Sequence, residues 1–214
     1  MSSLCLHLLN ARGALSDLAD WLHASLSAAH GKATEVLPLG PLDVVVMEGQ
    51  RVIPEKGHVG YAPSPGIVFV TIDPGNPAVR ANADQSLERM FVHELHHAAR
   101  WDGPGYGASL GEALVSEGLA GHFVREVYGD VPEPWEALPR SDVVPNVALA
   151  QQDWAQTRYR HGDWFFGAGE MPRWLGYSLG FRLVRRHLDA HPQESAASLA
   201  RAEAEGFRES LDSI

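Results

Sequence analysis

Residues 93–97, His-Glu-Leu-His-His, carry side chains whose types and spacing suit metal-dependent hydrolysis. On a helix, positions four apart differ in direction by roughly 40° at about 100° per residue, so His93 and His97 project from one face and can share a metal ion. Glu94 flanks this pair, and a carboxylate there can take a proton from a zinc-bound water, whose pKa the metal lowers to about 7. The motif therefore predicts a zinc site at which Glu94 is the general base.

The segment around this motif has the pattern of an amphipathic helix. Apolar and motif residues recur at three-to-four spacing from Leu87 to Ala98, and a more polar side includes His96. Asp84 can cap the start, and residues 102–105, Asp-Gly-Pro-Gly, break any regular pattern. We expect a helix from about residue 85 to 101, in which His96 has a supporting or surface role.

A third protein ligand is needed, because catalytic zinc usually takes three and leaves the fourth position to water. Ser109 and Glu112 have the spacing of a capping box, and the helix predicted after them carries Glu117 in an apolar or small stripe. A buried carboxylate is costly unless it is paired or bound to metal, so we predict Glu117 as the third ligand. The alternatives are a structural carboxylate satisfied by Arg or backbone donors, or Glu112 as ligand, although capping already explains Glu112. Gly118 and Gly121 would let the two helices approach closely.

These motifs resemble those of the gluzincin metallopeptidases, in which two motif histidines and a glutamate on the next helix hold zinc. More specifically, the chain resembles a bacterial family of uncharacterised domains described as zinc-dependent proteases. The resemblance rests on H-E-L-H-H-A-A-R at 93–100, E-A-L-V-S-E-G-L-A at 112–120, W-F-F-G at 164–167 and P-R-W-L-G-Y-S-L-G at 172–180. These blocks span about residues 40 to 190. The resemblance implies a zincin-like fold, a Zn2+ cofactor and a peptide or protein substrate.

One position departs from the gluzincin pattern. Gluzincins commonly carry an acid four residues after the ligand glutamate, where it can orient a ligand histidine, and here that residue is Gly121. Because such partners fix the tautomer and basicity of a ligand imidazole, another group must take this role. Asp102 and a backbone carbonyl are the alternatives.

Amide hydrolysis also needs a donor to the oxyanion that develops on the substrate carbonyl. By resemblance to gluzincins, a tyrosine or histidine would supply it, and Tyr177 is our first candidate because it lies on one face of a predicted C-terminal helix with Phe181. His161 is the alternative donor, and a buried tyrosine bonded to some carbonyl is the structural explanation of Tyr177. We expect no ligand role for histidines 7, 23, 30, 58, 187 and 191, which are interpreted as lacking ligand-spaced partners.

Composition limits the partners. The 214 residues carry a formal net charge of −10 with a pI near 5.5, which argues against nucleic acid or an anionic membrane as the main partner. Arg182, Arg185 and Arg186 are interpreted as a solvated helix face. Cys5 is the only cysteine, so no intramolecular disulfide can form, and neither a signal peptide nor a membrane span is evident. We therefore expect a cytoplasmic protein; its oligomeric state is not predicted.

The order of predicted elements indicates an α+β fold with a small mixed sheet, an active-site helix and a ligand helix. We expect a helix at 14–29, strands at 43–47 and 67–72, and a short strand at 58–61. A proline-rich loop at about 130–146 separates an N-terminal α+β lobe, about 1–130, from a mostly helical C-terminal lobe, about 146–214, within a single metallopeptidase-like domain. Helices are expected at about 147–160, 172–189 and 193–210. An edge strand precedes the active-site helix in zincin folds, so the resemblance implies that strand 67–72 is an edge strand along which a peptide substrate lies extended.

These observations favour a zinc metallopeptidase with His93, His97 and Glu117 on the metal, Glu94 as general base and Tyr177 as oxyanion donor. Two alternatives remain open at this point. One is a non-catalytic zinc-binding interaction or structural protein derived from a peptidase fold. The other is a zinc hydrolase that acts on a non-peptide bond.

Overall fold

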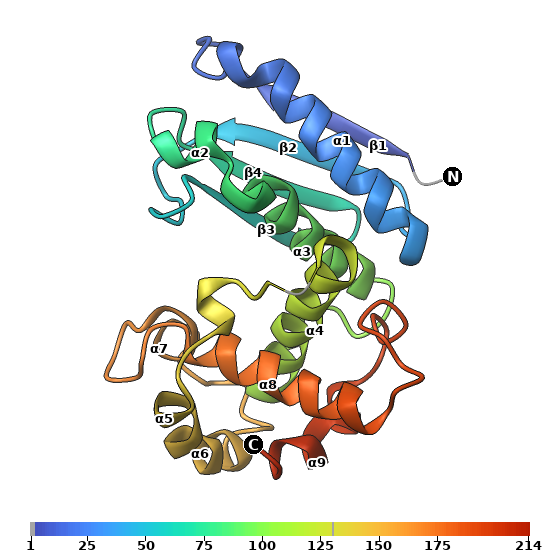
Figure 1. The fold of residues 1–214 in the computed structure, drawn as a ribbon, viewed down its shortest axis with the longest axis vertical. Helices are drawn as coiled ribbons and strands as arrows, with labels where there is room; N and C mark the ends of the chain where they lie inside the picture. The colour runs from blue at the N-terminus through green and yellow to red at the C-terminus, as the bar shows by residue number, and fades with distance from the viewer. Residues whose placement is uncertain (1–2, 130) are drawn as a thin grey trace. The chain divides into compact units, whose positions relative to one another are not determined.

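The computed structural model describes residues 3–129 and 131–214, which cluster into two compact units, residues 1–102 and 103–214 (Figure 1). Residue 130, at the start of the predicted loop, lies outside the described residues. The α+β class and the small mixed sheet are confirmed, because the first unit contains a four-stranded sheet and the second is helical. The single metallopeptidase-like domain over residues 1–214 stays a prediction.

The sheet of the first unit has the strand order β1-β2-β4-β3. Three strands run parallel and the fourth, β3, is antiparallel to β4; the bounds are Leu4–Leu9 for β1, Leu42–Glu48 for β2, His58–Ser64 for β3 and Ile67–Ile72 for β4. Alternate side chains of β2 and β4, such as Val44 and Val68, are fully buried, as expected for β-branched strands covered on one face. The predicted strands at 43–47, 58–61 and 67–72 are therefore confirmed, and β1 is an additional strand.

Strand β4 is not an edge strand, so the prediction that a peptide lies along residues 67–72 is wrong. It pairs with β2 on one side and with β3 on the other. The edge next to it is β3, which the sequence shows only weakly because Gly60 and Pro63 interrupt its pattern.

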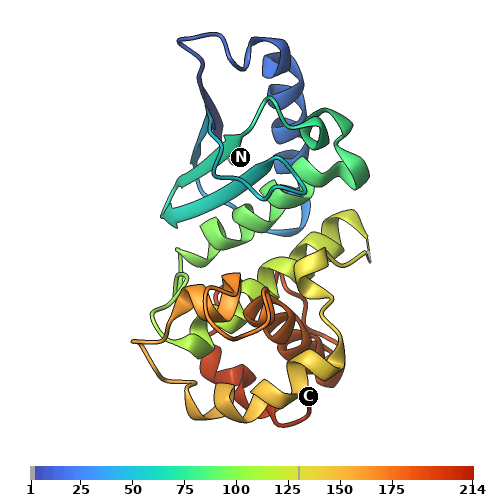
Figure 2. The same cartoon turned by 90° about the vertical axis from the view of Figure 1, so that its left-hand side faces the viewer.

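Helices α1 (Ala19–Val36) and α3 (Ser86–Arg100) lie side by side on one face of this sheet (Figures 1 and 2). A 3-10 turn at Ser16–Leu18 precedes α1, and α2 (Pro77–Ala81) with a 3-10 turn at Ala83–Gln85 precedes α3. The helix predicted at 14–29 begins later because the Asn10 side chain accepts the Leu15 N–H in a loop. The helix predicted at 85–101 is confirmed.

The second unit is built around α4 (Leu110–Tyr128) and α8 (Leu175–Ala190). The two helices cross at glycines: a Cβ at Gly118 would run into the Gly180 carbonyl, and a Cβ at Gly180 would run into the Leu114 carbonyl. The prediction that Gly118 and Gly121 admit the active-site helix is therefore corrected: Gly118 admits α8, and Gly121 faces Glu136 and Phe181.

Shorter elements surround this pair. They are α5 (Arg140–Val143), α6 (Val147–Gln152), α7 (His161–Phe166), α9 (Arg208–Leu211) and 3-10 turns at Pro134–Glu136, Val144–Asn146 and Ala204–Phe207. The helix predicted at 172–189 is confirmed as α8. The helices predicted at 147–160 and 193–210 are wrong, because turns interrupt both segments. Within residues 3–129 and 131–214, no helix combines the length and apolar character that crossing a membrane requires.

Candidate metal centre and its surroundings

Helix α3 begins at a cap that differs from the predicted one. The Asn82 side chain accepts the Leu87 N–H at 2.9 Å and donates to the Glu88 carboxylate at 2.8 Å. Asp84, the predicted cap, instead lies in a 3-10 turn with a positive φ of 54° and makes no cap hydrogen bond. Asn82 thus satisfies an N-terminal donor of the helix that carries the motif.

The two motif histidines meet on α3, as their spacing predicts. Their Nε2 atoms lie 3.0 Å apart, and their rings stand edge to face at 78°. Two nitrogens bound to one tetrahedral zinc at about 2.0–2.1 Å each are separated by about 3.4 Å, so a small rotation of either ring suffices to hold the ion. His97 is buried and His93 is half-buried.

Glu94 is buried at 8% exposure and lies against the edge strand β3. A Cβ at Gly60 would run into the Glu94 side chain and the sulfur of Met90, so only glycine at this strand position leaves room for the carboxylate. At the end of α3, the Trp101 indole N–H donates to the Ala62 carbonyl of β3 at 3.0 Å. Strand and helix therefore hold the proposed general base between them.

Glu117 belongs to α4, whose start is fixed by the predicted capping box. The Ser109 hydroxyl accepts the Glu112 N–H, and the Glu112 carboxylate accepts the Ser109 N–H at 2.8 Å. Glu112 is thus engaged in capping, as expected. Glu117 is 8% exposed, and its Oε1 accepts a hydrogen bond of 2.8 Å from the Tyr106 hydroxyl.

Tyr106 is a partner that the sequence did not reveal, because it lies in the loop before α4 with no ligand-like spacing to Glu117. Burial, followed by the negative charge of Glu117, raises the pKa of Tyr106 well above its usual value. The phenol therefore stays protonated and acts as a donor. It fixes one carboxylate oxygen of Glu117.

Tyrosine and histidine side chains of the second unit surround this pair. The Tyr159 hydroxyl lies 3.1 Å from Nδ1 of His161, and the His161 ring stacks on Phe165 at 4.4 Å. Burial, then the charges of Glu117 and Glu112, raises the pKa of Tyr159 to about 12, while burial lowers the pKa of His161. Tyr177 packs edge to face on the same Phe165 ring at 5.0 Å. Both predicted oxyanion donors therefore share one aromatic cluster with Tyr159, which the sequence did not single out.

Gly121, where gluzincins commonly carry an acid, faces another carboxylate. A Cβ at this position would meet Oε1 of Glu136, which is buried at 5% exposure. Glu136 reaches this place from a 3-10 turn, where its Oε2 accepts the Glu133 N–H at 2.8 Å. A carboxylate is thus present one turn beyond Glu117, supplied by a residue outside the motif. Asp102, one of the expected substitutes, is exposed.

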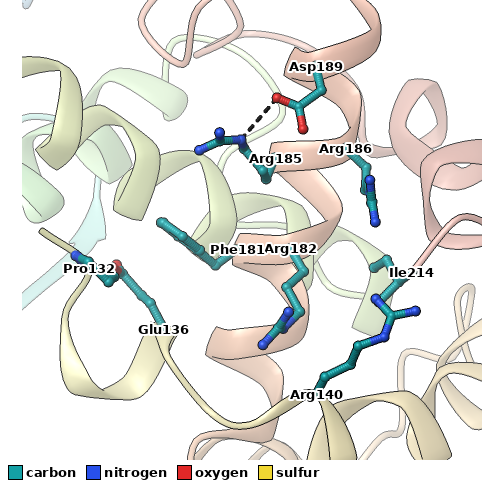
Figure 3. Close-up of a pocket in the computed structure, with 9 residues that line it drawn as sticks. All are labelled: Pro132, Glu136, Arg140, Phe181, Arg182, Arg185, Arg186, Asp189 and Ile214. Atoms are coloured by element: carbon teal, nitrogen blue, oxygen red, sulfur yellow. Dashed lines mark hydrogen bonds and ion pairs between the residues drawn. The ribbon is translucent and has the colours of Figure 1, made fainter. Parts of the chain in front are cut away.

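A pocket of about 360 Å³ lies along residues 181–189 of α8 (Figure 3). It contains none of the predicted site residues; those lining it are Pro132, Glu136, Arg140, Phe181, Arg182, Arg185, Arg186, Asp189 and Ile214. Arg185 and Arg186 are exposed, as predicted, and Arg185 pairs with Asp189 at 3.0 Å. Arg182 is instead half-buried, because its Nη2 donates to the Leu138 carbonyl at 2.7 Å.

The expectation that His187 and His191 lack ligand-spaced partners is wrong. They are four residues apart near the end of α8, the same spacing as in the motif on α3, and Glu194 lies beside them. The spacing alone could have identified this pair in the sequence.

A family comparison now defines the class of this protein. The chain belongs to the family described as "Predicted Zn-dependent protease (DUF2268)", whose profile matches residues 21–209, a range that contains both α3 and α4. The resemblance to a family of zinc-dependent proteases is thereby confirmed.

Two curated proteins of Bacillus subtilis (strain 168) are among its relatives. One, "Uncharacterized protein YjfC", is 28% identical over 153 residues, which cover 64% of this chain and 50% of that protein. The other, "Uncharacterized protein YjaZ", is 27% identical over 131 residues, covering 54% of this chain and 47% of that protein. The chain therefore spans about half the length of the curated relatives it matches.

Proposed function

We propose that this protein is a zinc metallopeptidase in which His93, His97 and Glu117 bind one Zn2+ ion and Glu94 is the general base. The observation that carries the proposal is the pairing of two Nε2 atoms at 3.0 Å on α3, with the buried Glu94 as the next residue after His93. Two imidazoles and a carboxylate form a donor set that suits zinc. The family description supports the same metal.

Glu117 is suited to be the third ligand because of its surroundings within the second unit. A buried carboxylate needs compensation, and the Tyr106 hydroxyl supplies one charge-assisted hydrogen bond to Oε1. The proposal assigns the second oxygen to the metal. A tyrosine that orients a ligand carboxylate raises the fraction of time that the carboxylate points at the ion.

When bound, zinc supplies a Lewis acid that lowers the pKa of a coordinated water and polarises the substrate carbonyl. Glu94 would take a proton from the attacking water and would later deliver that proton to the leaving nitrogen of the cleaved peptide bond. The burial of Glu94 between α3 and β3 keeps its side chain in one place during both transfers.

Edge strand β3 is suited to align a peptide beside Glu94. The Asp73 N–H bonds to the Gly57 carbonyl at 2.9 Å, so by antiparallel alternation the backbone groups of residues 58, 60 and 62 face away from β4. Two of the outward carbonyls already accept hydrogen bonds: that of His58 from the Ile53 N–H, and that of Ala62 from the Trp101 indole N–H. We propose that an extended substrate pairs with Gly60, which places its backbone next to the general base.

The oxyanion donor comes from the aromatic cluster of the second unit in this proposal. Tyr177 offers a phenol and His161 offers an imidazole N–H. A Tyr159 hydroxyl that donates to Nδ1 of His161 would leave the proton of the neutral ring on Nε2, which is the form that can donate to an oxyanion. Replacing Tyr177 by Phe and His161 by Ala in separate variants distinguishes the two donors, since only the true donor lowers turnover with unchanged zinc content.

The decisive experiment combines metal analysis of the purified protein with cleavage of a peptide library, using Glu94→Gln as control. We expect one zinc held by His93, His97 and Glu117, cleavage by the native chain, and no cleavage by the variant. A native protein that binds zinc and cleaves no peptide would instead support the non-catalytic zinc-binding protein. Zinc binding that is unchanged by His97→Ala would overturn the assigned ligands.

A further inference from the structure

A second group of metal-ligating side chains lies in the second unit. His187 and His191 occupy successive turns at the end of α8, and Glu194 follows in the next loop. One ligand atom from each of the three residues lies within 4.8 Å of the other two. Nε2 of His187 is 2.8 Å from Oε2 of Glu194.

Hydrogen bonding fixes His191 in a ligand-competent tautomer. Its Nδ1 lies 2.9 Å from the His187 carbonyl, and a carbonyl oxygen only accepts, so Nδ1 carries the proton. The neutral ring therefore keeps its lone pair on Nε2. An imidazole whose Nδ1–H donates to a backbone carbonyl is the usual arrangement of a metal-ligating histidine.

The surroundings of the group favour a cation and hold one ligand still. The C-terminal end of α8 carries the negative end of the helix dipole, and Glu194 adds a carboxylate. His187 is 7% exposed and packs between the His191 ring at 4.3 Å and the Phe207 ring at 4.2 Å. His191 and Glu194 are exposed, so an ion can reach the group from solvent.

We propose that His187, His191 and Glu194 form a second divalent-cation site, for a borderline ion such as Zn2+ or Ni2+, independent of the site on α3. Binding replaces the hydrogen bond between His187 and Glu194 by bonds from both to the metal. The proton of His187 then resides on Nδ1, which is buried and has no hydrogen-bond partner within the part of the chain that the structure describes. The cost of this buried N–H makes the site weaker than the one proposed on α3.

The site would act as a clip at the end of α8. Two and three residues after Glu194, Ala196 and Ala197 donate their N–H groups to the Glu126 carboxylate of α4. A metal ion that joins His187 and His191 to Glu194 therefore ties the end of α8 to a loop already bound to α4. Because the ion binds only the folded arrangement, it stabilises the second unit.

The test measures zinc binding by chelator competition on the full chain in a His93→Ala/His97→Ala background, which removes the first site. This background still contains Cys5, His7 and Asp43, an exposed group that could also hold zinc. A zinc ion is therefore assigned to the proposed second site only if a substitution in that site removes it. We expect His191→Ala to remove one equivalent, or to weaken it at least tenfold, and Glu194→Gln to weaken it as well. The exposed His23→Ala is the matched control, with no change.

A thermal readout accompanies the titration. Saturating zinc should raise the Tm of the background protein by a few degrees. His191→Ala should remove that rise without changing the Tm of the metal-free chain. Zinc stoichiometry and affinity that are the same with and without His191 overturn the second site. Peptidase activity is not measured in this test, so its outcome is separate from that of the proposed function.

Discussion

Two helices of this protein carry a pair of histidines four residues apart, and the pairs differ in what stands around them. On α3 the rings meet edge to face at 78° with both Nε2 atoms 3.0 Å apart. On α8 the rings of His187 and His191 stack at 27°, and one of them is held between its neighbour and Phe207. Helical spacing brings two imidazoles together in both places, but the two rings are oriented differently in each pair.

The two pairs also differ in the residue that follows the first histidine. On α3 it is Glu94, which is buried against β3, and on α8 it is Leu188. A metal bound by His187 and His191 therefore has no carboxylate at the position that corresponds to Glu94, the proposed general base. The comparison predicts one catalytic site and one structural site.

The largest effect is expected from removing a ligand of the proposed catalytic site on α3. His97→Ala should abolish both stoichiometric zinc binding at α3 and peptide cleavage, because two remaining ligands hold zinc poorly. His191→Ala should leave cleavage intact. Cleavage measured with metal content for both variants checks this, and equal losses from both would erase the distinction between the pairs.

Glu94→Gln should separate binding from chemistry on α3. The amide keeps the size of the side chain but cannot accept a proton, so kcat should fall by about 10²–10⁴-fold while zinc content stays at the native value. Steady-state kinetics with metal analysis provides the measurement. Glu88→Gln, on the same helix but bonded to Asn82, is the control variant and should retain turnover. Retained turnover in Glu94→Gln would show that another group is the base.

Gly60→Ala tests how β3 positions that base. The added methyl group must displace the Glu94 side chain, so we expect kcat to fall by up to about 10²-fold with zinc binding preserved. Gly40→Ala is the matched control, because a Cβ there has open space. If Gly60→Ala has native kinetics, Glu94 does not depend on its contact with β3.

Tyr106→Phe should have the smallest effect of the four and acts on affinity. Losing the hydrogen bond to Glu117 should weaken zinc binding about 10–100-fold, as removal of partners that orient a ligand typically does. Tyr61→Phe is the control, since Tyr61 is exposed on β3. Competition with a chelator gives both affinities. An unchanged value for Tyr106→Phe would mean that Glu117 is held without this donor or does not bind the metal.

The sequence predicted those parts of the fold and site that depend on local periodicity and spacing. The helix around His93, the capping box at Ser109 and the β-branched strand at 67–72 follow from such patterns, and the structure contains all three. The edge position of β3 did not follow, because strand order depends on pairing between distant segments. Tyr106, Tyr159 and Glu136 were missed for a similar reason: each reaches its place from a loop or short turn, where no repeating pattern marks the side chain.

Because α4 and α8 cross at Gly118 and Gly180, the position of Glu117 depends on a residue far away in the sequence. Glu117 is the residue before Gly118, and at this crossing bare main chain rests on bare main chain. A single methyl group at position 180 would therefore push α4 sideways and carry the Glu117 carboxylate with it. We therefore expect activity to be sensitive to substitution of Gly180, which is not one of the proposed site residues. An inactive Gly180→Ala protein would keep every proposed reacting group but would have Glu117 displaced.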